Sequence, residues 1–395
     1  MKRATFNATA AALALGAVAA GKSAEAAEQS AEDLKKSLQA QADRARLIRD
    51  RGLKPHYTTK FDLSGLPRYQ PERLESGWLR IHGSNYLTEG ALADYWVAGF
   101  AKYQPMIRLS FYTPTSAAAF AALYYDQADL IMDHAALFYD MLAYQRIKNG
   151  NPVQVSAATG SYDVPGWQNS LCIMANEKVP LKGITLKQLD GIFGAERNGG
   201  WSGTNFRPDW ARSANENVRT WDQLGLGGQW AGKRINPYGF SIRYATATEF
   251  SDRFLRGSDK WNERIVGFAN LVTPDGKLYL EQDQMTDALA KDVYGIAYNR
   301  FRGDKPGVKR IPVAKDEHGP FVEHTIETVQ NRSYPMFSEV FFYANAKPNK
   351  SGGMVREFLR YVLSQEGQTE VQRDGKYLPL TAAIVKDQLP KLAQL

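Results

Sequence analysis

The hydrophobic pattern after residue 76 predicts strands and helices in alternation. Residues 78–82 alternate between apolar and polar side chains, as in a half-buried strand, and this strand ends at Gly83. Apolar residues at helical spacing then predict a helix over 88–103. The next predicted elements are a strand over 107–111, a helix over 116–125 and a strand over 128–132. This order predicts a parallel sheet with crossover helices.

The middle and the end of the chain repeat this alternation around one irregular insertion. Residues 194–232 are rich in Gly, Asn, Trp and Arg, which predicts a long loop region. Thr185 is a candidate N-cap for the helix predicted after it. Strands are expected over 170–176, 234–238, 294–298 and 340–344, and helices over 185–193, 247–255, 283–291, 354–364, 367–373 and 381–389.

The first 26 residues have the three parts of a secretory signal peptide. A basic start, Met1 to Arg3, precedes an alanine-rich apolar run and small residues suited to cleavage before Ala27. The apolar run is shorter than the roughly 20 residues that a membrane-spanning helix needs. We therefore expect a periplasmic protein, with the export route (Sec or Tat) left open. Residues 27–76 are interpreted as an amphipathic helix over 31–51 followed by an extended linker.

Composition narrows the class of protein. The formal net charge is +7, but no dense run of Lys or Arg indicates nucleic-acid binding. The single cysteine, Cys172, lies in an apolar run and is expected to be a buried thiol, without a disulfide or a metal cluster. No nucleophile elbow, zinc motif or phosphate-cradling Gly-rich loop is present, so we expect neither an enzyme nor a cofactor. A phosphatase that uses His134 is the enzymatic alternative.

Four strand-to-helix loops carry the candidate ligand-binding residues. In open parallel sheets, ligands bind beyond the carboxyl ends of the strands, where helix N-termini present free N–H groups that suit oxyanions. The alternative for each loop is plain helix capping, because Ser, Thr and Asn cap helices in all proteins. The candidates are Gly83, Ser84 and Asn85 in the first loop, Thr115 and Ser116 in the second, Asp133 and His134 in the third, and Tyr238, Arg243 and Thr246 in the fourth.

Four segments along the chain have the character of family motifs, namely Gly83-Ser84-Asn85 and residues 128–132, 182–194 and 294–298. Together they resemble the phosphate-binding proteins of phosphate ABC transporters, which have the type II periplasmic-binding-protein fold. Gly83-Ser84-Asn85 resembles the Gly-Ser-Thr-like loop of that family, and residues 128–132 resemble its Ala-Asp-Ile-Gly strand. Residues 182–194 are similar to its Gly-Leu-Thr-x-x-Gln-Leu-x-x-Ile-Phe helix, and residues 294–298 to its Gly-Ile-Gly-Tyr strand. The similar segments occur in the same order from about residue 77 to residue 380.

The resemblance implies an α/β fold with two lobes, a hinge and a central ligand cleft. Residues 77–168 and 320–395 would form lobe I, and residues 169–319 would form lobe II. The implied function is capture of an inorganic oxyanion, phosphate first, by a monomer that delivers it to an ABC-transporter permease. Asp133 or His134 would accept a proton from a protonated oxyanion, as the aspartate of the family does.

The fourth loop departs from the family pattern. Residues 241–248 read Ser-Ile-Arg-Tyr-Ala-Thr-Ala-Thr, where phosphate binders carry Arg-x-x-Gly-Ser-Gly-Thr, so the glycines are missing and the arginine is shifted. The alternatives are therefore the same fold binding an organic anion or a sugar-like solute, or acting as a sensory or surface binding protein.

Overall fold

The computed structural model describes residues 56–164, 168–275, 278–346 and 351–395. The predicted signal peptide and the predicted helix over 31–51 lie outside these residues. Within the described ranges, no helix has the length and apolar character required to cross a bilayer.

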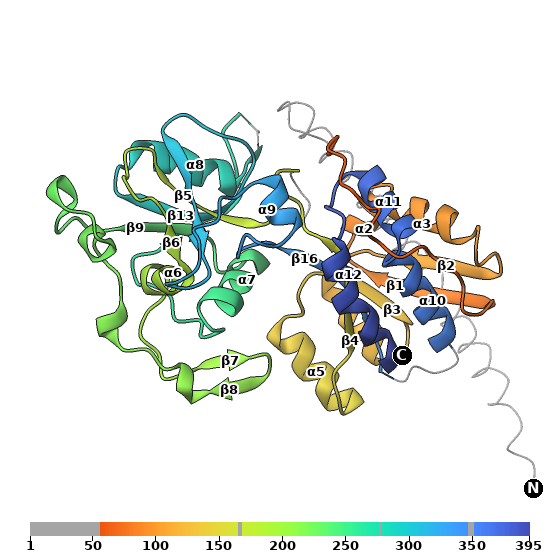
Figure 1. Ribbon diagram of the computed structural model, residues 1–395. Helices are drawn as coiled ribbons and strands as arrows, with labels where there is room; N and C mark the ends of the chain where they lie inside the picture. The colour runs from red at the N-terminus through yellow and green to blue at the C-terminus, as the bar shows by residue number, and fades with distance from the viewer. Residues whose placement is uncertain (1–55, 165–167, 276–277, 347–350) are drawn as a thin grey trace, which may run out of the picture. The chain divides into compact units, whose positions relative to one another are not determined.

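The first lobe is built on a five-stranded sheet with the order β2-β1-β3-β16-β4 (Figure 1). Strand β1 pairs in parallel with both β2 and β3, whereas β16 runs antiparallel to β3 and β4. The strands are β1 (Gly77–Gly83), β2 (Ile107–Tyr112), β3 (Leu130–Asp133), β4 (Val153–Thr159) and β16 (Glu339–Ala344). The helices are α2 (Tyr86–Glu89), α3 (Leu92–Phe100), α4 (Ala119–Tyr124), α5 (Phe138–Lys148), α10 (Gly352–Val362), α11 (Gln365–Asp374) and α12 (Ala382–Gln388), with short 3-10 turns η1 (Ser116–Ala118) and η6 (Leu389–Gln394).

Strand β16 shows why this sheet is covered on both faces. Its residues are buried almost throughout, and neighbouring side chains point to opposite faces of the sheet. The ring of Phe342 packs against Trp96 of α3 and Phe358 of α10, at centroid distances of 5.7 Å for each. The ring of Tyr343 packs against Phe120 of α4 on the other face, at 4.9 Å. A continuous apolar run is typical of a strand with helices on both sides.

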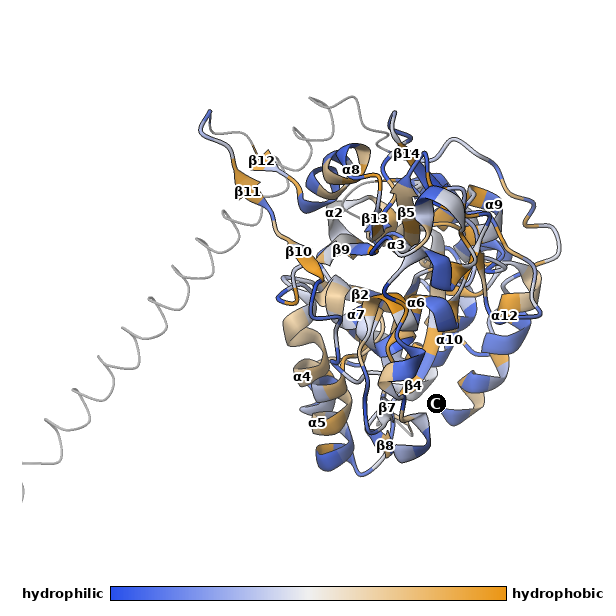
Figure 2. Ribbon diagram, turned by 90° about the vertical axis from the view of Figure 1, so that its left-hand side faces the viewer, coloured by the Kyte–Doolittle hydropathy of each residue, from blue (hydrophilic) through white to orange (hydrophobic). Residues whose placement is uncertain are grey.

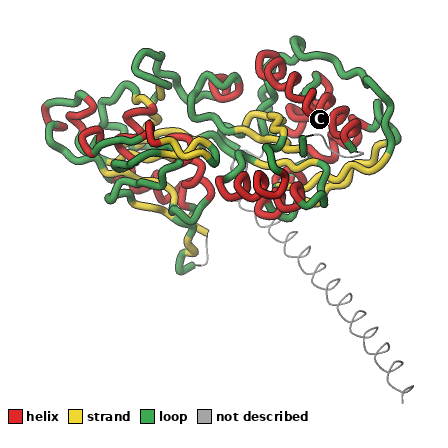
Figure 3. Tube along the Cα trace, turned by 90° about the horizontal axis from the view of Figure 1, so that it is seen from below, coloured by secondary structure: helices red, strands yellow, loops and turns green. Residues whose placement is uncertain are grey.

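The second lobe is built on a five-stranded sheet with the order β10-β9-β13-β5-β14. Strand β9 pairs in parallel with β10 and β13, and β5 runs antiparallel to β13 and β14. The strands of this sheet are β5 (Leu171–Asn176), β9 (Asn236–Phe240), β10 (Val266–Phe268), β13 (Gly295–Arg300) and β14 (Val308–Ile311). The helices are α6 (Leu186–Phe193), α7 (Ala245–Phe254), α8 (Glu281–Lys291) and α9 (Ile326–Gln330). Figure 3 shows helices beside the strands in both lobes.

Short pairs and 3-10 turns complete the second lobe. They are β6 (Ile184–Thr185) with β15 (Val313–Ala314), β7 (Gly200–Ser202) with β8 (Asn205–Arg207), β11 (Leu271–Val272) with β12 (Leu278–Tyr279), and η2 (Pro208–Trp210), η3 (Ala214–Glu216), η4 (Trp221–Leu224) and η5 (Gly228–Trp230). Figure 2 shows that the segment from β10 to β12 carries apolar residues, and Val266, Leu271 and Val272 on it are exposed.

The chain passes between the lobes twice, and the two crossings are hydrogen-bonded to each other. The first follows β4 and leads into β5, and the second follows α9 and leads into β16. The amide of Gly160 donates to the carbonyl of Ser338 at 2.7 Å, and the amide of Leu171 donates to the carbonyl of Met336 at 3.1 Å. Two adjacent crossings are the arrangement that hinge closure requires. The structure therefore confirms the predicted two-lobed α/β fold.

The structure corrects the sequence predictions at three places. The structure has two helices, α2 and α3, where one helix was predicted over 88–103. They are separate because Gly90, which follows α2, has an extended backbone conformation. Helix α5 and strand β4 were not predicted. The segment over 57–76 is irregular as expected, but Tyr57, Leu63, Leu66 and Tyr69 are buried, so it belongs to the core and is not a free linker. The Thr185 cap is confirmed, since the side chain of Thr185 accepts from the amide of Gln188.

Gly83 closes β1 where the backbones of β1 and β3 approach each other. Its φ of 144° is one that glycine alone adopts readily. A Cβ atom at this position would lie 2.0 Å from the carbonyl oxygen of Met132. The glycine is therefore required for the spacing of the two strands.

A hairpin from the tryptophan-rich insertion contacts the first lobe. The ring of Trp201 in β7 meets the ring of Phe138 at the start of α5 edge to face, with a centroid distance of 5.0 Å. The hydroxyl of Thr204 donates to Oε1 of Gln145 in the same helix at 2.7 Å. The hairpin formed by β7 and β8 is thus a link between the lobes apart from the two crossings (Figure 1).

We expect the Trp201→Ala substitution to loosen the start of α5. An aromatic pair contributes about 0.5–1.5 kcal/mol, so amides near Phe138 should exchange with deuterium about 2- to 10-fold faster. Trp210→Ala is the matched control, because Trp210 contacts Arg207 and Arg256 of its own lobe. Equal acceleration in both variants, or none in either, would show that the hairpin does not link the lobes.

Candidate functional site

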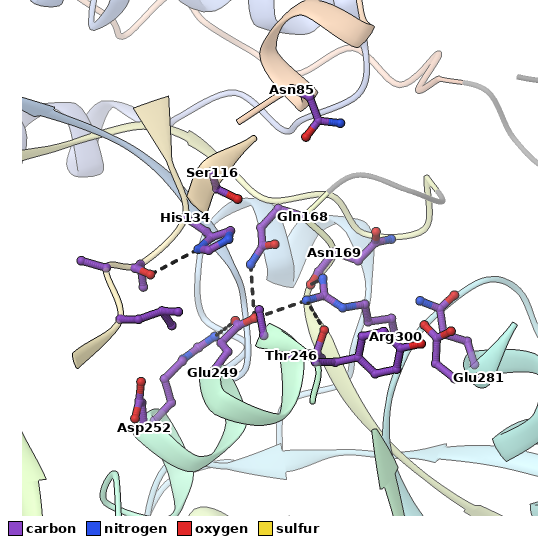
Figure 4. A pocket seen from close by; sticks show the side chains of 17 residues that line it. Asn85, Ser116, His134, Gln168, Asn169, Thr246, Glu249, Asp252, Glu281 and Arg300 are labelled. Carbon is purple, nitrogen blue, oxygen red and sulfur yellow. Dashed lines mark hydrogen bonds and ion pairs between the residues drawn. The ribbon is translucent and has the colours of Figure 1, made fainter. Parts of the chain in front are cut away.

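One cavity of about 390 Å³ collects loops from both lobes and from the first crossing (Figure 4). The first lobe contributes Asn85 before α2, Ser116 in η1 and the residues from His134 to Leu137 before α5. The second lobe contributes the start of α7, the start of α8 and the end of β13. The lining residues are Asn85, Ser116, His134, Ala135, Ala136, Leu137, Gln168, Asn169, Tyr244, Ala245, Thr246, Glu249, Asp252, Arg253, Glu281, Gln282 and Arg300.

Two helices of different lobes begin at this cavity. Leu137 precedes the first residue of α5, and Tyr244 to Thr246 include the N-cap and first turn of α7. The first turn of a helix has backbone N–H groups without intrahelical partners, and it carries the positive end of the helix dipole. Their meeting at one cavity creates an environment that favours a small anion.

The cationic centre of the cavity is Arg300, held by three groups. Its Nη1 donates to the carbonyl of Asn169 at 2.8 Å, and its Nη2 donates to Oγ1 of Thr246 at 3.2 Å. Its Nη2 also lies 3.3 Å from Oε2 of Glu249. Only 11% of the Arg300 side chain is exposed, so its position is fixed before any ligand arrives.

Glu249 is the carboxylate on which this arrangement is built. Its Oε1 pairs with Nη1 of Arg253 at 2.9 Å and accepts from the hydroxyl of Ser338 at 3.2 Å. Its Oε2 accepts from Nε2 of Gln168 at 3.2 Å, in addition to its contact with Arg300. Burial alone would raise the pKa of Glu249, but the charges of Arg300 and Arg253 outweigh burial and hold this pKa below its ordinary value. Glu249 is therefore ionised at neutral pH.

Asp133 lies behind His134 in a small adjoining cavity, which Ser84 and Gln168 also line. Its Oδ1 accepts from the backbone amide of His134 at 2.8 Å. Burial raises the pKa of Asp133 to about 6, against the opposing effect of His134. Asp133 can therefore change its protonation state close to neutral pH.

The cavity brings together four of the ten residues predicted from the sequence, namely Asn85, Ser116, His134 and Thr246. Ser84 and Asp133 lie in the adjoining small cavity. The remaining four residues do not line the main cavity: Gly83 is the last residue of β1, Thr115 caps η1, the hydroxyl of Tyr238 donates to Asp292 at 2.7 Å, and Arg243 is exposed.

Sequence reasoning missed Arg300, Glu249, Arg253, Gln168 and Asn169. Arg300 lies two residues after the predicted strand over 294–298, and it is the last residue of β13, which runs parallel to β9. The rule that selected the four loops therefore applied to Arg300 as well. Glu249 and Arg253 are separated by four residues on α7, which is a helix-pairing distance that the sequence shows.

This chain belongs to the PBP superfamily, because the family model described as a PBP superfamily domain matches residues 65–366. The phosphate-binding protein PstS of Pseudomonas aeruginosa is 27% identical to it over 332 residues, which cover 83% of this chain and 90% of that protein. The family match agrees with the two-lobed fold.

Solved structures with a similar course of the chain include PstS from Borrelia burgdorferi, with 14% identity and a TM-score of 0.48 over 78% of this chain and all of that one. An ABC-type phosphate transport receptor from Vibrio cholerae has 14% identity and a TM-score of 0.47, over 77% of this chain and all of that one. Both TM-scores are below 0.5, so family membership rests on the sequence match.

Asp252 should make the stability of the protein depend on pH. Burial, followed by the charges of Asp259 and Glu249, raises the pKa of Asp252 to about 6 from 3.8. Between about pH 4 and pH 6 the folded protein binds this proton and the unfolded chain does not, so stability falls as the pH rises through this window. The Asp252→Asn variant should lose less stability over this range than the wild type, as measured by thermal unfolding at pH 4.5 and pH 7.

Asp133 contributes a similar dependence in both proteins, so the slope should decrease without vanishing. Asp387→Asn removes an exposed carboxylate and serves as the control, which should keep the wild-type slope. An unchanged slope in Asp252→Asn would contradict the assigned environment of Asp252.

Proposed function

We propose that this chain is an exported solute-binding protein that captures an inorganic oxyanion, most directly phosphate, and presents it to an ABC-transporter permease. Membership of the PBP superfamily and the similarity to PstS of Pseudomonas aeruginosa support this proposal. That relative is named as a binding protein and not as an enzyme, which favours binding without turnover.

The observation that carries the proposal is the meeting of two helix starts and Arg300 at one cavity. The oxyanion would accept hydrogen bonds from free amides at the starts of α5 and α7 and from the hydroxyls of Ser116 and Thr246. Arg300 would supply positive charge, since Glu249 shares its single negative charge between Arg300 and Arg253. Of the ten residues predicted from the sequence, we retain Asn85, Ser116, His134 and Thr246 in the proposed site.

Capture would couple to movement of the lobes. Because α9 (Ile326–Gln330) lies in the second lobe, before the second crossing, we move the predicted boundary from residue 320 to the end of α9. The proposed lobe I then comprises residues 77–168 and 331–395, and the proposed lobe II comprises residues 169–330. Because each lobe supplies donors to the same ligand, a bound oxyanion would favour the closed arrangement over the open one. A monomer, a signal peptide over residues 1–26 and a periplasmic location belong to the same proposal.

Arg300→Ala should weaken the binding of inorganic phosphate. Hydrogen bonds to charged groups contribute about 1.5–3 kcal/mol, so the dissociation constant measured by isothermal titration calorimetry should rise about 10- to 100-fold. Arg243→Ala is the matched control, because Arg243 is exposed and does not line the cavity. Circular dichroism would check that both variants are folded.

The opposite result, with Arg243→Ala impaired and Arg300→Ala intact, would place the anion outside this cavity. Failure of the wild-type protein to bind phosphate, sulfate or molybdate would reject the oxyanion assignment altogether.

A further inference from the structure

Two buried polar atoms of the cavity lining have no hydrogen-bond partner among the described residues. They are Nδ2 of Asn169, a donor, and Oε2 of Glu281, an oxygen of a carboxyl group. Asn169 is 3% exposed and Glu281 is 9% exposed. Each unpaired buried polar group costs free energy, and because these two line the same cavity, one ligand can complete both.

The two atoms require ligand groups of opposite kinds, an acceptor for Asn169 and a donor for Glu281. An oxyanion satisfies the side-chain NH2 group of Asn169, and the backbone carbonyl of the same residue already accepts a hydrogen bond from Arg300. The carboxyl group of Glu281 calls for a donor, and a cationic donor compensates a buried carboxylate best. Figure 4 shows Glu281 at the end of the cavity opposite His134, with Arg300 between them.

The charges of the lining support a cationic group on the ligand. Arg253 and Arg300 are paired with Glu249, while Asp252 and Glu281 are further carboxyls without a hydrogen bond to either arginine. Arg302 lies near Glu281, but its Nη1 donates to Gln282. Burial raises the pKa of Glu281 although the charges of Arg300 and Arg302 oppose it, so its ionised form is costly unless a cation bonds to it directly. A ligand that carries both charges fits this balance better than a bare dianion.

The size of the cavity agrees with a ligand larger than an inorganic oxyanion. Its volume is about 390 Å³. Cavities of about 300–1,000 Å³ are typical of sites for small organic molecules. Space therefore remains beside an oxyanion at Arg300 for a short carbon chain that leads toward Glu281.

We propose that the cavity takes a zwitterionic organic phosphate or phosphonate, whose oxyanion binds at Arg300 and Asn169 and whose ammonium group binds at Glu281. This inference rests on the proposed function and names a substrate class for the same site. Inorganic phosphate would use the oxyanion part of the site alone.

The test compares three phosphonates that differ only at the end facing Glu281, with inorganic phosphate as the reference for the oxyanion part of the site. Calorimetric titration of the full-length protein would use inorganic phosphate, ethylphosphonate, 2-hydroxyethylphosphonate and 2-aminoethylphosphonate. A charge-assisted hydrogen bond should make 2-aminoethylphosphonate bind about tenfold or more tightly than ethylphosphonate. The hydroxyl analogue should gain less, because it is uncharged. These comparisons need no variant and do not depend on the folding of one.

The Glu281→Gln variant assigns the preference to one residue. It should lower the ratio of the two dissociation constants, that of ethylphosphonate divided by that of 2-aminoethylphosphonate, to near one. Asp387→Asn removes an exposed carboxylate outside the cavity and should keep the wild-type ratio, so it controls for a general effect of negative charge. Thermal unfolding would check that each variant is folded.

The outcomes separate this inference from the proposed function. If the wild type binds inorganic phosphate but gains nothing from the amino group, the substrate class proposed here is wrong and the oxyanion function stands. If the preference survives in Glu281→Gln, Glu281 is not the ammonium site. If none of the four compounds binds, the oxyanion function itself fails.

Discussion

The site depends on the ion pairs of a single buried carboxylate, Glu249. It pairs with Arg253 on its own helix and with Arg300 on strand β13, and it accepts hydrogen bonds from Gln168 and Ser338. Gln168 belongs to the first crossing between the lobes and Ser338 to the second. One carboxylate therefore connects the cationic centre of the cavity to both hinge segments. Removing one member of a buried ion pair leaves the other as an uncompensated charge in the interior. Single substitutions in this network should therefore destabilise the protein.

The pairing of Glu249 also determines how the cavity attracts its ligand. Glu249 compensates one of the two positive charges of Arg253 and Arg300 before a ligand binds. Affinity would then come from the remaining charge together with directed donors, namely the helix starts of α5 and α7 and the side chains around Arg300. Directed donors distinguish ligands by their shape and protonation state, whereas the net charge of a protein does not. The formal net charge of +7 for the whole chain adds at most a long-range, salt-dependent attraction.

The sequence predicted the sheets and the general place of the site because both follow from local patterns. The alternation of apolar and polar residues located the strands, and ligands bind beyond the carboxyl ends of parallel strands. These two rules led to Asn85, Ser116, His134 and Thr246. Helix α5 was missed because Tyr144 is its only fully buried residue, so its apolar periodicity is weak. Arg300 and Glu249 were missed as a pair because they meet only when β13 and α7 pack together. Tyr238 and Arg243 were assigned to the fourth loop together with Thr246, but the direction of each side chain depends on the strand register and the turn.

Gly83 does not line the cavity, yet it affects the spacing of the loops that do. The loops that follow β1 and β3 carry Asn85 and His134, and the separation of these loops follows the separation of the two strands. The missing side chain of Gly83 gives the carbonyl of Met132 the clearance it needs. Even a single methyl group there would act as a wedge between the strands and displace one wall of the cavity relative to the other. The shape of the binding cavity thus depends, in part, on the lack of a Cβ atom at one position of the strands that support it.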